Sequence, residues 1–159
     1  MNNTDIFHIL LYSIPEAFAV ISLSTVLAGS GFIWKRLVIM GLFIGLFSHF
    51  WRLLLSDYIL NIIIYTIILI VFMTFYRLGN DLFARAISTL LAISIYLTIE
   101  FVNLKIFDLV FGLNPIDMLA KPLLRYICFA GQISIIFLIC ALLMYLKFSL
   151  FGRVFDEEI

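Results

Sequence analysis

The clearest absence in this sequence is that of charge. Only 13 % of the 159 residues are Asp, Glu, Lys or Arg, whereas 65 % are hydrophobic. A soluble globular domain carries about 25 % charged and about 45–50 % apolar residues, and a chain this apolar would expose large hydrophobic patches to water. The composition therefore predicts an integral membrane protein. Acidic and basic residues balance and are scattered, so we expect no nucleic-acid partner.

Residues that carry metal and redox chemistry are equally scarce. Cys128 and Cys140 both lie in apolar sequence, where a small buried side chain is the ordinary role. The H-E-x-x-H motif, the phosphate-binding glycine loop and the dinucleotide fingerprint are all absent from the sequence. We therefore expect neither an enzyme nor a metal site. An intramembrane cysteine peptidase that uses Cys128 and His49 stays open as an alternative, without a local signature.

The two histidines raise one cofactor hypothesis. Axial ligation of haem needs two imidazoles that face each other at matched depth. His8 and His49 would both lie toward the outer side of a bundle, but no motif accompanies them. We expect no cofactor and keep haem ligation by these two residues as the alternative.

Long apolar runs, separated by charges and turn residues, are what the sequence does contain. A hydrocarbon core about 30 Å thick takes about 20 helical residues. The runs are continuous and do not alternate as barrel strands do, which predicts helices. We expect an all-α polytopic bundle of five spans, with an interfacial or lid segment before the last. The predicted spans are 14–33, 37–55, 58–76, 82–102 and 122–147, and the interfacial segment is 103–121.

Basic residues at the span ends predict the orientation, because cytoplasmic loops are enriched in Lys and Arg. The first, third and C-terminal connections hold six of them and the other side holds four. This excess predicts an extracytoplasmic N-terminus and a cytoplasmic C-terminus in the cell inner (plasma) membrane. The six are Lys35, Arg36, Arg77, Arg85, Lys147 and Arg153, and the four are Arg52, Lys105, Lys121 and Arg125.

The start of the first span contains the segment Ser13-Ile14-Pro15-Glu16. It fits a capping box, in which Ser13 is the N-cap and Glu16 reaches back to the Ser13 amide. Pro15 would then lie in the first turn, where it loses no helical bond. This interpretation places Glu16 at the outer rim. In the alternative, the span begins at Ile6 and Pro15 kinks it around a carboxylate near the midplane.

Ionisable residues inside apolar spans are costly in lipid and are candidates for function. With the predicted orientation they fall in the outer half of the bundle. One interpretation is a pocket, open to the outside, that binds a ligand; the other is a set of ion pairs from Glu100 to Arg52 or Arg125 that only fix packing. Snorkelling of the arginines to the head groups is a further alternative. The predicted cluster comprises Glu16, His49, Arg52, Glu100 and Arg125.

Small and amide residues in the spans predict helix contacts. Gly41 and Gly45 form a G-x-x-x-G spacing, which permits close approach of helices in lipid. The contact is either internal or the face of a homodimer. Asn61 and Gln132 are expected to form hydrogen bonds between helices.

Several of these features occur together in one known family. Ser13-Ile14-Pro15-Glu16-Ala17 opens the first span, Arg52 ends the second and Glu100 lies late in the fourth. This layout resembles the N-terminal membrane sensor region of the agr-type peptide-sensing histidine kinases of Firmicutes, over the whole chain but without a specific motif. The resemblance implies a bacterial, sensor-like module. Because no kinase region follows, it also implies that any signal passes to a partner.

The expected function is therefore that of a non-enzymatic sensor-like or regulatory module. It would bind an extracytoplasmic peptide or small molecule, or a partner within the membrane. The first alternative is an accessory or assembly subunit of a larger membrane complex. The second is a small transporter or its substrate-binding subunit, although the sequence shows no internal repeat and only Pro15 could break a span.

Overall fold

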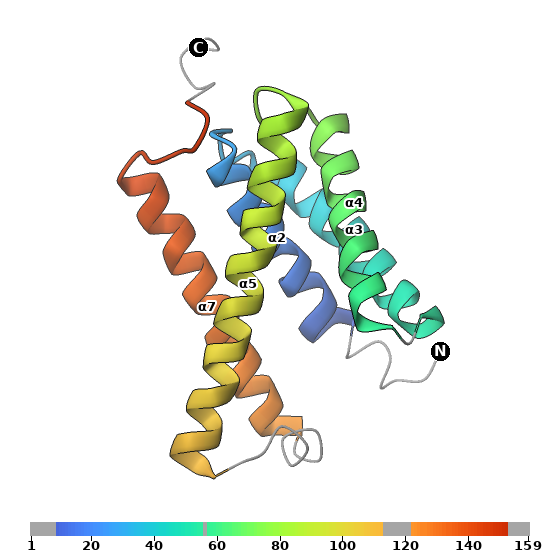
Figure 1. Cartoon of the computed structure of the whole chain (residues 1–159), viewed down its shortest axis with the longest axis vertical. Helices are drawn as coiled ribbons and strands as arrows, with labels where there is room; N and C mark the ends of the chain where they lie inside the picture. Colours follow the sequence, from blue (N-terminus) through green and yellow to red (C-terminus); the bar gives the residue numbers. More distant parts are fainter. Residues whose placement is uncertain (1–8, 56, 113–121, 153–159) are drawn as a thin grey trace.

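The computed structural model describes residues 9–55, 57–112 and 122–152, and these residues contain helices and no strand. Successive helices run in opposite directions (Figure 1). The all-α bundle predicted from the apolar runs is confirmed. In chain order the elements are the π-helical turn η1 (Ile9–Ser13), α2 (Ile14–Leu27), α3 (Trp34–Leu54), α4 (Tyr58–Phe75), α5 (Leu82–Phe111) and α7 (Pro122–Tyr145).

Helix α2 lies at the centre of the bundle. It packs against α3, α5 and α7, and its residues 19–27 are all buried. Two of its hydroxyls, on Ser24 and Thr25, donate to the carbonyl oxygens of Val20 and Ile21 at 2.8 Å. These bonds back to the preceding turn allow polar side chains to be buried without a partner on another helix.

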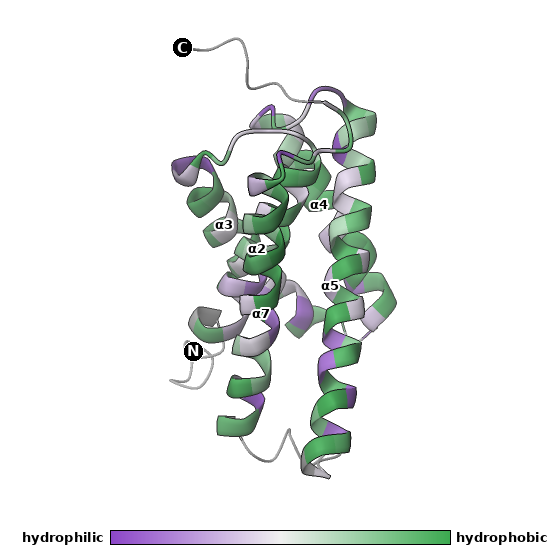
Figure 2. Cartoon of the chain, turned by 90° about the vertical axis from the view of Figure 1, so that its left-hand side faces the viewer, coloured by the Kyte–Doolittle hydropathy of each residue, from purple (hydrophilic) through white to green (hydrophobic). Residues whose placement is uncertain are grey.

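The other helices carry the apolar surface. Four of them are long and apolar enough to cross a membrane: Trp34–Leu54, Tyr58–Phe75, Leu82–Val110 and Leu123–Tyr145. The first predicted span is represented by a shorter apolar helix, Leu11–Leu27. Hydrophobic residues cover the helices along most of their length (Figure 2), and outward-facing side chains such as Phe43, Phe75 and Leu109 are largely exposed. This apolar helical bundle is consistent with an integral membrane protein.

Two helix ends differ most from the predicted span ends. Helix α2 stops at Leu27, six residues before the predicted limit at 33. Gly29, two residues after this end, has a φ of 81°. Helix α5 runs past 102 to Phe111 and ends at Gly112, whose φ of 61° is the left-handed conformation common after helices. The first part of the predicted interfacial segment is therefore the last part of α5. Residues 113–121 of that segment lie outside the described residues.

The predicted capping box at the start of α2 is wrong. Ser13 has helical dihedral angles, φ −67° and ψ −39°, and its side chain makes no capping hydrogen bond. The helix instead continues from the wider turn η1, which accommodates the ring of Pro15 directly after it. Glu16 is thus free of a capping role and reaches across to α3.

The glycines of α3 serve an internal contact. A Cβ placed on Gly45 would lie 2.8 Å from Cα of Ile14 and 2.9 Å from the carbonyl oxygen of Ser13. A Cβ on Gly41 would lie 3.3 Å from Cβ of Phe18. Helix α3 therefore approaches η1 and α2 closely because these positions lack side chains. The chain's own helices cover the face for which a homodimer contact was the alternative.

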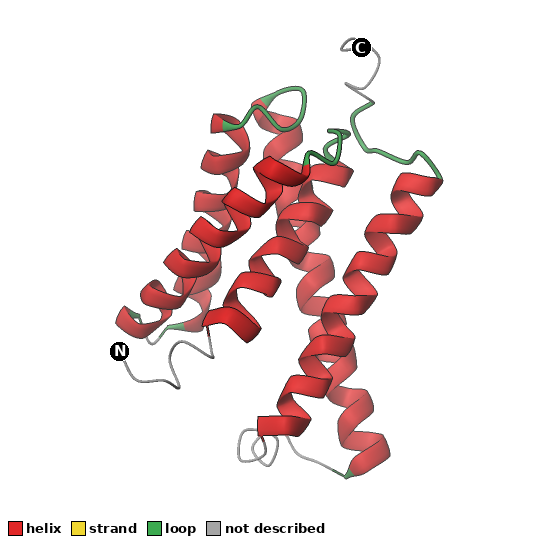
Figure 3. Cartoon of the chain, turned by 180° about the vertical axis from the view of Figure 1, so that it is seen from behind, coloured by secondary structure: helices red, strands yellow, loops and turns green. Residues whose placement is uncertain are grey.

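The residues after α7 return to the end of α2. This segment, residues 146–152, is called the strap below. The Leu150 amide donates to the Leu27 carbonyl at 3.1 Å, and Asn80 Nδ2 donates to the Phe151 carbonyl at 2.8 Å. The strap thus lies at the same end of the bundle as the α2–α3 and α4–α5 connections (Figure 3).

Candidate functional site

A pocket of about 480 Å³ lies inside the bundle and is lined by every helix from η1 to α7. Helix α4 packs against α3 and α5, whereas α2 packs against α3, α5, α7 and η1. The space left between α2 and α4 is the pocket. Its volume falls in the range of about 300–1,000 Å³ typical of sites for small ligands.

The wall of the pocket divides into two kinds of residue. Apolar side chains from four helices form one part: Val20, Ile44, Ile62, Ile68, Ile93 and Leu97. Aromatic and polar side chains form the other part, and most of them come from the end of the bundle at which α2 and α4 begin: Tyr12, Glu16, Trp51, Arg52, Tyr58, Asn61, Tyr65, Tyr96, Glu100, Arg125, Phe129 and Gln132. An apolar cavity with a few convergent polar groups is the usual composition of a ligand site.

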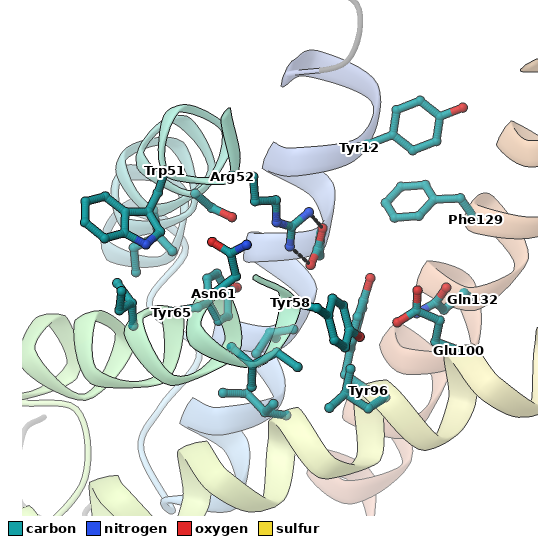
Figure 4. A pocket seen from close by; sticks show the side chains of 18 of the residues that line it. Tyr12, Trp51, Arg52, Tyr58, Asn61, Tyr65, Tyr96, Glu100, Phe129 and Gln132 are labelled. Carbon is teal, nitrogen blue, oxygen red and sulfur yellow. Dashed lines mark hydrogen bonds and ion pairs between the residues drawn. The ribbon is translucent and has the colours of Figure 1, made fainter. Parts of the chain in front are cut away.

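Glu16 and Arg52 form the strongest polar contact of the site. The Arg52 guanidinium donates to both carboxylate oxygens, with distances of 2.6 Å from Nη2 to Oε1 and 3.0 Å from Nη1 to Oε2 (Figure 4). Such a bidentate, charge-assisted pair is directional as well as strong. The Glu16 side chain is 14 % exposed and that of Arg52 is 47 % exposed. The pair joins the first turn of α2 to the last turn of α3.

Glu100 does not form the ion pairs predicted for it. Arg52 is bound to Glu16 instead, and no basic group among the described residues lies within ion-pair distance of Glu100. Glu100 lines the pocket from α5 and is only partly exposed. The ion pairs considered for Glu100 are therefore not formed among the described residues, where the Arg52 guanidinium is bound to Glu16.

Arg125 lines the pocket from the first turn of α7 and lies over an aromatic ring. Its guanidinium carbon is 5.1 Å from the centre of the Tyr12 ring, which is within the range of a cation–π contact. Tyr12 in turn packs against Phe129 of α7, with ring centres 5.0 Å apart. These aromatic contacts hold η1 against α7.

His49 is the member of the predicted cluster that the structure places elsewhere. Helix α3 turns Ser48, Trp51 and Arg52 toward the pocket, and His49 is not among the lining residues. Its ring lies edge-on to Phe50, with centres 6.0 Å apart. His8, the other residue of the haem hypothesis, lies outside the described residues. In the part of the chain that is described, no group of His, Cys, Asp and Glu residues is arranged to hold a metal ion.

Asn61 and Gln132 do not form the expected hydrogen bonds between helices. Asn61 Nδ2 donates to the Leu55 carbonyl just before its own helix, at 3.1 Å. Asn61 Oδ1 and Gln132 Nε2 are buried and have no hydrogen-bond partner among the described residues. Asn103 is an amide that does form an interhelical bond, since it donates from α5 to the Cys128 carbonyl on α7 at 2.7 Å.

Several residues of the site were not predicted from the sequence. Trp51 Nε1 and Tyr65 Oη are also buried without a partner among the residues described, and both line the pocket. Helical spacing from the predicted polar residues is the signal that would have found some of them. Tyr58 and Tyr65 lie three and four residues from Asn61, and Tyr96 lies four residues before Glu100, so each pair shares a helix face.

Comparisons with known proteins leave the site to be interpreted from its own residues: no protein-family model, no curated protein and no solved structure matches the chain.

Proposed function

We propose that this chain is a non-enzymatic integral membrane protein that binds a small or peptidic ligand in the pocket and acts as a sensor-like or regulatory module. One observation carries the proposal. Four buried polar atoms on α3, α4 and α7 lack a hydrogen-bond partner among the described residues, and the residues that bear them all line the same cavity. Buried polar atoms are nearly always hydrogen-bonded, so a ligand or ordered water is the expected partner.

The proposed topology has five spans, with the N-terminus outside and the C-terminus in the cytoplasm. Helix α2 runs between the same two ends of the bundle as α3 and α4 (Figure 1), and the surrounding helices shield it from lipid. Lys and Arg are more frequent at the end of the bundle that holds the α2–α3 and α4–α5 connections, and this excess supports placing that end in the cytoplasm. The polar part of the pocket then lies toward the extracytoplasmic side of the plasma membrane.

The position of α2 supports a regulatory role. Its first turn carries Glu16, which lines the pocket, and its last residue accepts a hydrogen bond from Leu150 of the strap. A ligand that displaces α2 would therefore also move the strap at the cytoplasmic end. The resemblance of the sequence layout to agr-type sensor regions would fit such a role, in which a membrane or cytoplasmic partner receives the signal.

The test is to purify the protein in lipid nanodiscs and identify by mass spectrometry what is bound to it. We expect a molecule that is retained by the wild type and lost from Glu100→Gln. Asp108→Asn is the matched control, because Asp108 is a carboxylate on the same helix that pairs with Lys105 outside the pocket, at 3.7 Å. Equal retention by all three proteins would contradict binding in this pocket.

The same preparation separates the alternatives. An accessory subunit would co-purify with other membrane proteins and hold no molecule in its pocket. A transporter would move the bound molecule across a sealed vesicle, whereas the proposed module would bind it without transport.

A further inference from the structure

The charges that line the pocket are not compensated equally. Glu16 and Arg52 neutralise each other, and Arg125 lies over the ring of Tyr12 in the first turn of its helix. A long arginine side chain in that position can extend its charge to the head-group region. Glu100 has neither arrangement, since it lies well inside α5 and has no ion pair or hydrogen bond with a described residue. An unpaired carboxylate at this depth is costly in lipid.

The side chains around Glu100 are suited to a positively charged ligand. Tyr58 of α4 and Tyr96 of α5 line the same part of the pocket, and Figure 4 shows them with Glu100 around one open space. The face of a tyrosine ring attracts an ammonium group placed within about 6 Å. A carboxylate and aromatic faces together form a site for a donor that carries positive charge. Asn61 Oδ1, which lies farther along the pocket beside Arg52 (Figure 4), adds an acceptor without a partner among the described residues.

Further atoms of the pocket define the rest of the ligand. Gln132 is 4 % exposed, and its Nε2 group donates to no described residue. The Trp51 indole N–H is also buried and donates to no described residue. The Gln132 donor, which Figure 4 shows beside Glu100, is suited to a carbonyl or hydroxyl oxygen near the ammonium group, and the Trp51 donor is suited to a polar group farther along the ligand. The isoleucines of the wall, Ile62, Ile68 and Ile93 among them, are suited to an apolar body.

Resting on the proposed function, we infer that the ligand is an amphipathic organic cation: an ammonium group bound at Glu100, an adjacent oxygen acceptor, and an apolar body among the isoleucines. The ammonium group supplies the partner that Glu100 lacks within the protein. The structure favours this class over an anion in the part of the pocket that Glu100 lines, because the carboxylate repels an anion and Arg52 is already bound by Glu16.

The experiment uses three probes that share one apolar body and differ in the head group: 4-phenylbutylamine, 4-phenylbutan-1-ol and 5-phenylpentanoate. The protein is studied in phosphatidylcholine nanodiscs, whose lipid carries no net charge. Trp34→Phe leaves Trp51 in the pocket as the only tryptophan of the chain, so its fluorescence reports binding there. We expect the amine to bind about tenfold more tightly than the alcohol and the carboxylate, which corresponds to about 1.4 kcal/mol.

Two variants test the assignment to Glu100. Glu100→Gln should abolish the preference for the amine while it leaves the binding of the alcohol unchanged, and Asp108→Asn should keep the preference. The comparison of the three probes on the Trp34→Phe protein alone already tests the inference if Glu100→Gln fails to fold.

Each outcome decides between the two proposals. Equal binding of all three probes, or tightest binding of the carboxylate, overturns the organic-cation inference but leaves ligand binding in the pocket intact. A fluorescence signal that none of the probes changes overturns the organic-cation inference, whereas ligand binding itself is overturned by equal retention in the mass-spectrometry test. A preference for the amine that survives in Glu100→Gln overturns the assignment to this carboxylate.

Discussion

Glu16 of α2 and Arg52 of α3 form a bidentate ion pair across the bundle, with nitrogen–oxygen distances of 2.6 and 3.0 Å. They are separated by 36 positions in the chain, and each lies at the end of its helix where most polar residues of the pocket gather. The pair fixes the distance between two helices that line the candidate site. It also leaves Glu100 as the pocket carboxylate without a basic partner among the described residues.

The first prediction concerns this ion pair. Arg52→Met leaves the carboxylate of Glu16, which is 14 % exposed, without its partner. We expect a loss of about 1–3 kcal/mol in the free energy of unfolding, below the figure for a fully buried pair because Arg52 is about half exposed. The measurement is chemical unfolding in detergent micelles. The double variant Glu16→Gln with Arg52→Met should recover part of the loss, and a single variant as stable as the wild type would contradict the prediction.

The second prediction concerns the close contact of α3 with η1 and α2. Gly45→Ala places a methyl group 2.8 Å from Cα of Ile14 and should destabilise the protein by about 1–3 kcal/mol. Gly131→Ala is the matched control, because Gly131 is also helical and its Cβ would meet no described residue within 4 Å. Thermal unfolding of both variants in the same detergent is the measurement. Gly131→Ala should be neutral or stabilising, because alanine favours a helix over glycine; equal destabilisation by the two substitutions would contradict the role of the contact.

The third prediction concerns topology. Single cysteines are introduced into a chain in which the buried Cys128 and Cys140 are replaced by alanine. With α2 crossing the membrane, Leu11→Cys and Lys105→Cys should react with a membrane-impermeant maleimide on intact cells. Lys35→Cys should react only after the cells are permeabilised.

Two results would contradict the proposed topology in different ways. Reaction of the cysteine at position 35 on intact cells, without reaction at 105, would reverse the orientation. Reaction at 11 and 35 from the same side would show that α2 does not cross.

The fourth prediction concerns the strap. Gly29 has a φ of 81°, and a Cβ at this position would lie 2.1 Å from the carbonyl oxygen of Gly152. Gly29→Ala should therefore displace the strap and speed hydrogen exchange at the Leu150 amide, which is bound to Leu27. Gly112→Ala is the control, since Gly112 also has a positive φ of 61° but its Cβ would meet no described residue within 4 Å. Unchanged exchange at Leu150 in the Gly29 variant would show that the strap does not depend on this contact.

Much of the fold could be predicted from the sequence because each element depends on local composition. Apolar runs long enough to cross lipid are visible in the chain, and the four long apolar helices lie where these runs were found. The ends were harder to predict. Asn103 appeared to open a polar connection, yet α5 continues because this side chain bonds to the Cys128 carbonyl on α7 at 2.7 Å, a partner far away in the sequence.

The candidate site was predicted in part, because ionisable residues in apolar segments are also visible in local composition. Glu16, Arg52, Glu100 and Arg125 were selected as ionisable residues in apolar surroundings, and the structure places all four on the wall of one pocket. His49 was selected by the same criterion and lies outside the pocket wall. The tyrosines and Trp51 were not selected, since an aromatic residue in an apolar helix ordinarily faces lipid or core.

The sequence by itself determined that the chain is apolar enough for a membrane, that its described part is helical, and that a few ionisable residues lie within the helices. These properties depend on composition and on spacing within single segments. Only the tertiary structure decided that Glu16 pairs with Arg52, that Glu100 stays unpaired, and that a cavity separates α2 from α4. Partner choice and cavities depend on how helices far apart in the chain are placed against one another, to within a few ångströms, and no single segment encodes that distance.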